Sequence, residues 1–406
     1  MLKSLLHRLI RQRHFWREVG FDELTELYIS NMLRTFAVSL LAVFLPYYLH
    51  QNGYSFSAIF AFYGLFFVGR SVADIAAGYF VARYGPKHAI IISCILQTAS
   101  SALLLTLPDY HWPSWFIAPL YGASASFFFI AYHVEFSKIK HTNHAGKELG
   151  EMQIFDRAAT IAGPLMGGLV GAFWGPQYIF AIACVVLFAS LWPLFRTPEQ
   201  VRQHQRIDLR SVPIARLGRD YVSYVALGLE NTLCINLWPM YLALFALGGS
   251  VYASLGILSS LAVVVSMVAA YFFGRHIDTR NARSLLRFMA FSNAVVYLWR
   301  PFVMGPLSAL LTNVINEAVT TGYRMPYLKG MYAAADDLPG LRIAYIMTLE
   351  WMGTISKGTV WFVLAILAAG GVPGKTVIFI GFMLAGLASL LIATERFRAL
   401  NTSVRR

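Results

Sequence analysis

Long apolar runs alternate with short polar segments along most of the chain. About twelve of these runs reach roughly 20 residues, which is enough for a helix to cross a hydrocarbon core about 30 Å thick. This pattern predicts an all-α membrane protein with twelve transmembrane helices. The expected spans are 26–49, 56–82, 88–107, 113–136, 152–173, 176–195, 219–246, 251–274, 285–303, 306–326, 342–369 and 374–393.

The two halves of the chain carry similar features in the same order. Gly78 opens a basic turn after an apolar run, and Gly274 does the same 196 residues later (274 − 78). Pro46 and Pro239 each begin a short Tyr- and Leu-containing element. Two matching features at nearly one offset indicate an internal repeat. We therefore expect a basic amphipathic segment at 1–25, a six-helix bundle at 26–195, a linker at 196–218, a second six-helix bundle at 219–393 and a basic tail at 394–406.

Composition agrees with a membrane location and indicates an orientation. Hydrophobic residues make up 57% of the chain and charged residues 13%, compared with roughly 25% charged in ordinary soluble proteins. The net charge of +13 collects before the first span, after the even-numbered spans and in the linker and tail. By the positive-inside rule both termini are expected to be cytoplasmic. This placement argues against a nucleic-acid partner. Since no organelle signal is visible, the membrane is most simply a bacterial inner membrane.

Two polar groups in the first half are candidates for function. Asn31 and Arg34 lie within the first span, where a charge near the bilayer centre costs about 2.5–3.5 kcal/mol. Arg34 should therefore face a water-filled cavity or a carboxylate. Arg70 and Asp74 are four residues apart on the second span, so we expect them to pair on one helix face.

The basic turn after the second span resembles the loop signature of the major facilitator superfamily, Gly-x-x-x-Asp-Arg-x-Gly-x-Arg/Lys. Its residues here are Gly78, Arg83, Gly85 and Lys87, with Ala82 in place of the aspartate. The second copy departs from the signature at Thr279 and Asn281. The resemblance covers nearly the whole chain, and it implies a twelve-helix transporter fold that works as a monomer and in which these loops take part in gating. The expected gating residues are Asp74, Gly78, Arg83, Gly85, Lys87, Gly274, Asp278, Arg280 and Arg283.

The fifth span contains a glycine-rich element, Gly163-Pro164-Leu165-Met166-Gly167-Gly168. It resembles the Gly-Pro-x-x-Gly-Gly element of antiporter-type members of the same superfamily. Pro164 removes a helix hydrogen bond and bends the helix, while the glycines leave a flat surface for close packing. We therefore expect a helix-packing seam at Gly163, Pro164, Gly167 and Gly168, and the resemblance favours export.

The second half holds acidic residues in the middle of apolar spans. A carboxylate in a poorly hydrated site can bind and release a proton near physiological pH, so Glu230 and Glu317 are the candidates for proton coupling. The alternative is that each pairs with Arg34, Arg300 or Lys357. The full set of candidate binding or coupling residues in this half is Glu230, Asn231, Asn313, Glu317, Glu350, Trp351 and Lys357.

These features favour a secondary active transporter that moves a small organic solute by alternating access, coupled to H⁺ or Na⁺. Export is slightly favoured, and uptake of an anionic metabolite is the alternative, since Arg34 could bind an anion with help from Arg70 or Lys357 if these face the cavity. A receptor or scaffold on the same fold is a third reading. No phosphate-binding loop, catalytic arrangement or metal-like spacing of Cys94, Cys184 and Cys234 is visible, so we expect no enzyme activity, cofactor or metal.

Overall fold

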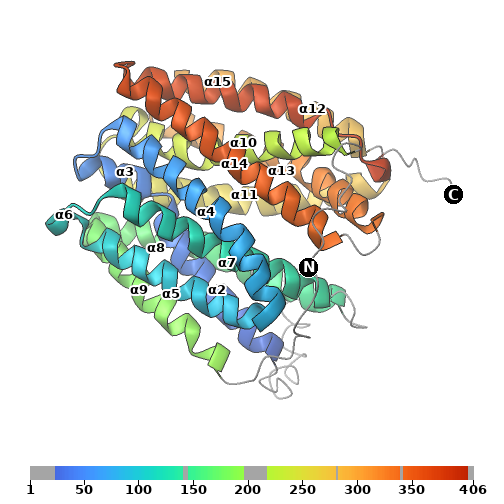
Figure 1. Cartoon of the computed structure of the whole chain (residues 1–406). Helices are drawn as coiled ribbons and strands as arrows, with labels where there is room; N and C mark the ends of the chain where they lie inside the picture. Colours follow the sequence, from blue (N-terminus) through green and yellow to red (C-terminus); the bar gives the residue numbers. More distant parts are fainter. Residues whose placement is uncertain (1–22, 140–144, 196–216, 280–281, 339–341, 401–406) are drawn as a thin grey trace, which may run out of the picture.

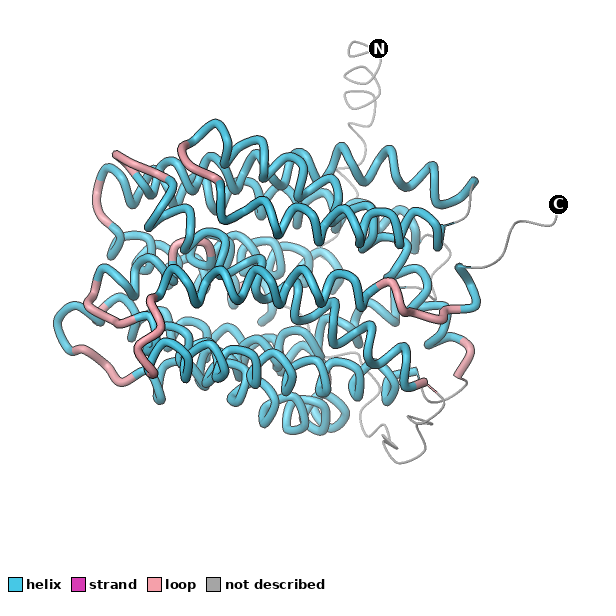
Figure 2. The backbone as a smooth tube through the Cα atoms, turned by 90° about the horizontal axis from the view of Figure 1, so that it is seen from above, coloured by secondary structure: helices cyan, strands magenta, loops and turns pink. Residues whose placement is uncertain are grey.

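The computed structural model describes residues 23–139, 145–195, 217–279, 282–338 and 342–400. Nearly all of these residues are helical, and no strand occurs among them (Figure 2). The amphipathic segment predicted at 1–25 and the linker at 196–218 fall largely outside this description, and so do residues 401–406 of the tail predicted at 394–406.

The described residues form twelve long helices in two groups of six, as the sequence predicts (Figure 1). The first group is followed by the second in the chain, and in Figure 1 they occupy the lower and upper parts of the molecule. The first group is α2 (Glu23–Ala42) with the short α3 (Leu45–Gln51), α4 (Phe56–Tyr84), α5 (Pro86–Leu105) with the short α6 (Leu107–Tyr110), α7 (Ser114–Ile139), α8 (Ala145–Phe173) and α9 (Pro176–Leu191). The second is α10 (Gly218–Tyr241), α11 (Val251–Thr279), α12 (Ala282–Trp299), α13 (Pro306–Asp336), α14 (Arg342–Ala369) and α15 (Gly374–Ile392).

Length and apolarity alone identify fewer spans than the fold contains. Among the described residues, seven helices are long and apolar enough to cross a membrane, and α2 with α3 makes an eighth. The others carry more polar residues: α10 contains Asp220 and Glu230, and α13 contains Glu317 and Arg324. Helices that pack against other helices in a bundle can tolerate such residues because neighbouring protein, rather than lipid, surrounds them.

The repeated Pro46 and Pro239 mark distortions at matching places in the two bundles. α2 stops before Pro46, and the chain bends by 43° into α3. Pro239 lies near the end of α10, after which Leu242–Ala246 forms a π-helix. A proline removes one helix hydrogen bond and crowds the preceding turn, so both distortions have a local cause.

The turn between α4 and α5 shows why its glycine and proline are needed. Gly85 has a φ of +95°, in the region that favours glycine, and its amide hydrogen-bonds the carbonyl of Val81. Pro86 follows as the first residue of α5, where its fixed φ suits a helix start. In the second copy, Arg280 lies outside the described residues, and Gly274 and Asp278 are described only as part of the α11 backbone.

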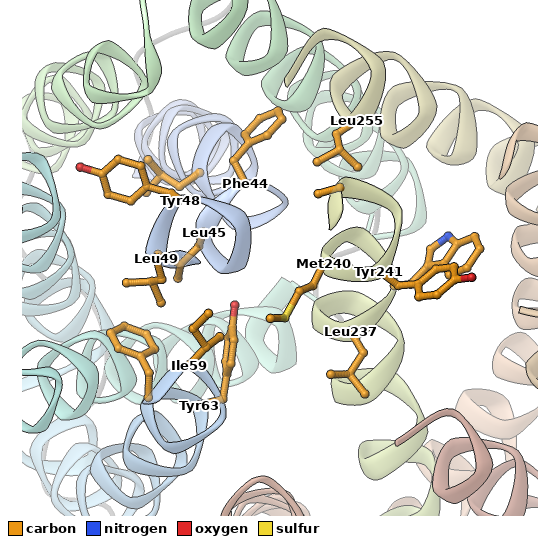
Figure 3. Close-up of a cluster of buried hydrophobic side chains, with 14 of the residues drawn as sticks. Phe44, Leu45, Tyr48, Leu49, Ile59, Tyr63, Leu237, Met240, Tyr241 and Leu255 are labelled. Atoms are coloured by element: carbon orange, nitrogen blue, oxygen red, sulfur yellow. The ribbon is translucent and has the colours of Figure 1, made fainter. Parts of the chain in front are cut away.

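Hydrophobic packing joins the two bundles at the end where α3 lies, which we call the α3 end. One cluster of buried side chains there draws on both bundles, and Figure 3 shows Met240 of α10 pointing toward Ile59 and Tyr63 of α4. Toward the opposite end, one buried cluster belongs to the first bundle and another to the second. The apolar core is thus shared at the α3 end and divided at the other.

Candidate functional site between the bundles

Helices α4 and α14 form one of the two seams between the bundles. Near the α3 end, a Cβ on Gly64 would lie 2.8 Å from the ring of Phe362, and near the opposite end a Cβ on Gly78 would lie 2.5 Å from Met347 Cε. The absence of a side chain at both glycines lets the helices approach closely. We call this contact the charged seam, because Arg70 and Asp74 of α4 and Glu350 of α14 lie between these two points.

An ion pair joins the bundles in the middle of the charged seam. Arg70 Nη2 on α4 lies 3.3 Å from Glu350 Oε2 on α14, with 12% and 25% of the two side chains exposed. The Tyr224 hydroxyl on α10 donates a hydrogen bond to the other oxygen of Glu350. Glu350, which belongs to α14, is therefore bonded both to α4 of the first bundle and to α10 of the second.

A second polar contact crosses the charged seam one turn away. The Thr354 hydroxyl on α14 donates a 3.3 Å hydrogen bond to Asp74 Oδ2 on α4, and both residues are buried. Arg70 and Asp74 were expected to pair with each other, and this expectation is wrong, because each bonds to a residue of α14 instead. Arg70 and Asp74 share one face of α4, and α14 packs against that face.

Two further cations lie close to this cluster. Lys357 on α14 is buried, and a Cβ on Gly228 would lie 2.6 Å from its Cε, so the glycine makes room for the lysine stem. The Arg324 guanidinium on α13 donates a hydrogen bond to Asn231. Lys357 is within electrostatic reach of Arg70, Asp74 and Glu350. The structure thus groups Asp74, Glu350 and Lys357 of the predicted residues with Arg70, which the sequence offers as a partner of Asp74 or as part of an anion site.

Helices α8 and α11 form the other seam, which we call the glycine seam. A Cβ on Gly168 would lie 2.6 Å from the carbonyl oxygen of Tyr252, and one on Gly256 would lie 2.4 Å from the carbonyl oxygen of Pro164. The Ser260 hydroxyl donates a 2.7 Å hydrogen bond to the carbonyl of Ile161. The helices here meet backbone to backbone.

The predicted packing element divides between two neighbours. Pro164 and Gly168 face α11 across the glycine seam, whereas Gly163 and Gly167 face α2 within the first bundle. A Cβ on Gly163 would lie 2.6 Å from Ser39 Cβ, and one on Gly167 the same distance from the Leu40 carbonyl oxygen. The residues at i and i+4 share a face, which explains the division.

Glu230 lies inside the second bundle, and none of the cations considered as its partners is within ion-pairing distance of it. It is 1% exposed, and Oε1 accepts hydrogen bonds from Asn293 Nδ2 at 3.0 Å and the Tyr297 hydroxyl at 2.7 Å, both on α12. Its Oε2 has no hydrogen-bond partner among the described residues. The alternative that Glu230 pairs with Arg34, Arg300 or Lys357 does not hold in this conformation.

Arg300 is a fully buried cation beside this network. Its guanidinium lies 4.2 Å from the Tyr297 ring and 4.8 Å from the Trp238 ring, and Nη2 donates a 2.6 Å hydrogen bond to Asn316. Asn313 accepts a hydrogen bond of 2.5 Å from the Trp238 indole. Glu317, on α13, is partly buried and interacts electrostatically with Arg324 and Arg300.

In the first bundle, Arg34 is 5% exposed and stacks on Phe128 of α7, with its guanidinium carbon 3.6 Å from the ring centroid. No carboxylate of the described residues forms an ion pair with it. A face-on aromatic ring supplies part of the stabilisation that a buried guanidinium needs. Asn31 donates a 2.7 Å hydrogen bond to Asp156 on α8. The structure thus places neither residue in the charged seam.

The basic residues of the two loop signatures bind glutamates of their own bundle. Lys87 Nζ lies 3.3 Å from Glu26 in the first bundle, and Arg283 Nε lies 2.8 Å from Glu395 in the second. Lys87 and Arg283 are 196 residues apart (283 − 87), the offset of the internal repeat. Arg83 is exposed, with its guanidinium 5.4 Å from the Tyr84 ring. Trp351 is 40% exposed.

Several members of these networks are not among the candidate residues that the sequence predicts. Tyr224 gives no signal in the sequence, since a tyrosine in an apolar span is usually interfacial or core. Asn293, Tyr297 and Arg300 follow one another at i, i+4 and i+7, and this polar stripe on an apolar span was a readable sign of a buried network. Among the described residues, no three His, Cys, Asp or Glu side chains are grouped so as to hold a metal ion.

Comparison with known proteins places the chain in a family. The Major Facilitator Superfamily model matches residues 27–347. The curated protein "Multi-drug resistance efflux pump PmrA", in two strains of Streptococcus pneumoniae, is 25% identical over 176 residues. The match covers 42% of this chain and 43% of the pump. The chain therefore spans less than half the length of these curated relatives.

Solved structures resemble this one over nearly their whole length. The nucleoside transporter NupG has a TM-score of 0.68 at 12% identity, covering 92% of this chain and 98% of its own. A peptide transporter POT in complex with sulfate has a TM-score of 0.71 at 12% identity, covering 91% and 92%. A D-xylose-proton symporter has a TM-score of 0.67 at 13% identity, covering 93% and 98%. At such identities the likeness establishes the twelve-helix, two-bundle fold.

Proposed function

Because the chain belongs to the major facilitator superfamily, we propose that it is a secondary active transporter that exports a small organic solute in exchange for protons. The two bundles rock about the seams between them, so that a central site opens to one side of the membrane at a time. Support for export comes from the partial match to an efflux pump and from the packing element of α8, which contributes two residues to the glycine seam.

The observation that carries the coupling proposal is the ion pair between Arg70 and Glu350. It joins the bundles through a carboxylate, and a carboxylate can be neutralised by one proton. Proton binding to Glu350 removes the charge that holds Arg70, so it weakens one contact between the bundles. The pair is present when Glu350 is ionised and is lost when Glu350 is protonated, which gives the proton control of the rocking motion.

Glu230 and Glu317 stay candidates for a second proton site. Glu230 is held by Asn293 and Tyr297 within the second bundle, so its protonation would act on the packing of α10 against α12. That is a less direct route to the seams than Glu350 offers. The liposome experiment described below distinguishes coupling to Na⁺ from coupling to H⁺.

The protein is an integral multi-pass membrane protein, and we place it in a bacterial inner membrane as a monomer. The basic loops then face the cytoplasm, together with the end opposite α3. Export in this orientation takes solute from the side where the hydrophobic cores of the bundles are separate and releases it at the α3 end. No catalytic role is proposed.

The test uses purified protein in liposomes that contain DNA, with the lipophilic cation ethidium outside. Vesicles with an acidic lumen should accumulate ethidium, because protons leave through protein inserted with its basic loops outward as ethidium enters. The fluorescence of DNA-bound ethidium measures this uptake, and nigericin, which collapses the pH gradient, should stop it. Uptake that follows a sodium gradient instead would overturn proton coupling, and absence of uptake would overturn export of lipophilic cations.

The same vesicles test the carboxylates one at a time. If Glu230 couples transport, Glu230→Gln should lose the response to the pH gradient while still binding ethidium. Transport by this variant that follows the gradient as the wild type does would remove Glu230 from the coupling mechanism and leave Glu350 and Glu317 as the candidate proton sites.

A second candidate function is uptake of an anionic metabolite. The cluster at the charged seam contains the cations Arg70, Lys357 and Arg324 against the two acids Asp74 and Glu350. Glu317 lies near Arg324 and balances its charge. Lys357, by contrast, forms no ion pair with a carboxylate in the described part of the chain, so it is the cation that an anionic solute group would meet. A panel of organic anions should then raise the thermal stability of the wild type, because a ligand that binds the folded state stabilises it. Loss of that effect in Lys357→Gln would favour uptake over export.

A further inference from the structure

A basic pocket lies at the end of the second bundle opposite α3, away from both seams. It has a volume of about 530 Å³ and lies where α10 and α12 begin and α15 ends. Its charged lining is Arg219, Arg283, Arg287, Glu395 and Arg396. This position is the edge of the membrane-spanning part of the bundle, at the level of lipid headgroups.

The charges of this pocket are only partly balanced. Glu395 is buried and engaged by Arg283, whose Nε and Nη2 lie 2.8 and 3.2 Å from its two oxygens. Arg219, Arg287 and Arg396 are exposed. Asp220, the nearby acid, is buried and accepts a 3.4 Å hydrogen bond from the backbone amide of Arg396. Three exposed arginines thus line one polar pocket whose carboxylate, Glu395, is already engaged by Arg283.

An apolar pocket of about 270 Å³ begins beside the basic one and runs along α10. The two share the first turn of α10 and the end of α15, through Gly218 and Arg219 and through Leu391 and Ala393. Its lining is entirely apolar side chains and backbone around Tyr221, Val222, Val225, Leu229, Met352 and Leu391. Val222 and Leu391 are 50% and 47% exposed, so this pocket opens to the surface of the bundle.

We propose that these two pockets bind one anionic glycerophospholipid, with its phosphate in the arginine pocket and an acyl chain in the apolar one. Arginine binds phosphate oxygens through paired, charge-assisted hydrogen bonds. Basic pockets between membrane helices suit anionic lipid headgroups. A soluble anion would use only the arginines, whereas the adjoining apolar groove fits a molecule that carries both a charge and a hydrocarbon chain.

The site has a structural consequence for the second bundle. The bound phosphate would link α10 and α12 with the residues that follow α15, since Arg219, Arg287 and Arg396 belong to these three segments. The lipid would thus stabilise the second bundle alone, because no residue lining either pocket comes from the first bundle.

The test is native mass spectrometry of the purified full chain, with phosphatidylglycerol or phosphatidylcholine of identical acyl chains added. The wild type should retain one phosphatidylglycerol in preference to phosphatidylcholine. The double variant Arg219→Gln/Arg287→Gln should weaken that retention about fivefold for each arginine removed. All of the substituted side chains are exposed, and thermal unfolding of each variant checks that it is folded.

Two matched controls separate this site from general effects of charge and bulk. Arg398→Gln removes an exposed arginine close in sequence to Arg396 but outside the pocket, and it should retain phosphatidylglycerol as the wild type does. Val222→Trp fills the apolar pocket and should weaken retention, whereas Val295→Trp, at a position of equal 50% exposure on α12, should not.

Three results would overturn the proposal. The first is equal retention of the two lipids by the wild type. The second is undiminished phosphatidylglycerol retention in both the double arginine variant and Val222→Trp. The third is thermal stabilisation by inorganic phosphate that equals stabilisation by phosphatidylglycerol, which would make the pocket a site for a soluble anion.

Discussion

Along α4 and α14 the bundles meet through charged and polar side chains, whereas along α8 and α11 they meet through glycine and backbone. The charged seam has the Arg70 to Glu350 ion pair at its centre. The glycine seam has Gly168 and Gly256 against opposing backbone, with the Ser260 hydroxyl bonded to a carbonyl. Both seams hold the same two bodies together.

The difference assigns separate tasks to the two seams. A contact made by backbone atoms cannot be changed by a proton, so the glycine seam can only set how closely the helices approach. A contact that depends on a carboxylate can be weakened by protonation at nearly constant shape. We infer that the glycine seam sets how closely the two bundles can approach and that the charged seam responds to pH.

The largest effect is expected where the glycine seam is blocked. In Gly168→Val the new Cβ would lie 2.6 Å from the Tyr252 carbonyl oxygen, and backbone cannot move aside as a flexible side chain can. Overpacking of this kind costs about 1–3 kcal/mol, so the closed glycine seam should be strongly depopulated. Solute flux in proteoliposomes should fall by about fivefold to about 150-fold.

Two other glycines serve as controls for this substitution. Gly248 has no atom within 4 Å of an added Cβ, so Gly248→Ala should transport normally. Gly163 faces α2 within the first bundle, so Gly163→Val should lower the thermal unfolding temperature. Normal flux in Gly168→Val would mean that the glycine seam does not limit the transport cycle.

An intermediate effect is expected where the charged seam loses its ion pair. Glu350→Gln keeps the shape of the side chain but removes its charge, so Arg70 no longer has an anionic partner. The pair is partly exposed, so its loss is about 1 kcal/mol, or about fivefold in the equilibrium between bundle arrangements. Flux in this variant should depend less on pH, and wild-type protein at low pH should behave like the variant at every pH.

The matched control for this change is Glu395→Gln. It also removes the carboxylate of an ion pair, but Arg283 and Glu395 belong to one bundle. We expect lower thermal stability with an unchanged dependence of flux on pH. If Glu395→Gln flattened the pH profile and Glu350→Gln did not, the pH response would belong to the second bundle rather than to the charged seam.

The fold was largely predictable from the sequence, for a physical reason. Lipid requires long apolar segments, and the hydrogen-bonding needs of the backbone allow them only one form here, so the runs at 56–82 and 374–393 correspond closely to α4 and α15. Turn chemistry is also local. Gly85 and Pro86 fix the start of α5 through their own backbone preferences.

The partners of the polar residues were much less predictable. Arg70 and Asp74 satisfy a valid rule for pairs on one helix, yet each finds its partner on α14, 280 residues away. The helix that covers a given face is a property of the assembled fold. The same limit applies to Gly163 and Gly168, whose different neighbours follow from the placement of α2 and α11 around α8.

The smallest effect is expected for single hydrogen bonds, one from each seam. Thr354→Val removes the donor to Asp74, and Ser260→Ala removes the donor to a helix carbonyl. A net loss of about 0.5 kcal/mol each corresponds to about a twofold change in flux. The two should nevertheless differ in kind. Asp74 loses a hydrogen bond that favours its ionised form, so Thr354→Val should alter the pH profile of transport, whereas Ser260→Ala should scale flux equally at every pH. Identical pH profiles for the two variants would show that both seams respond to protons alike, and the division of tasks between them would then be wrong.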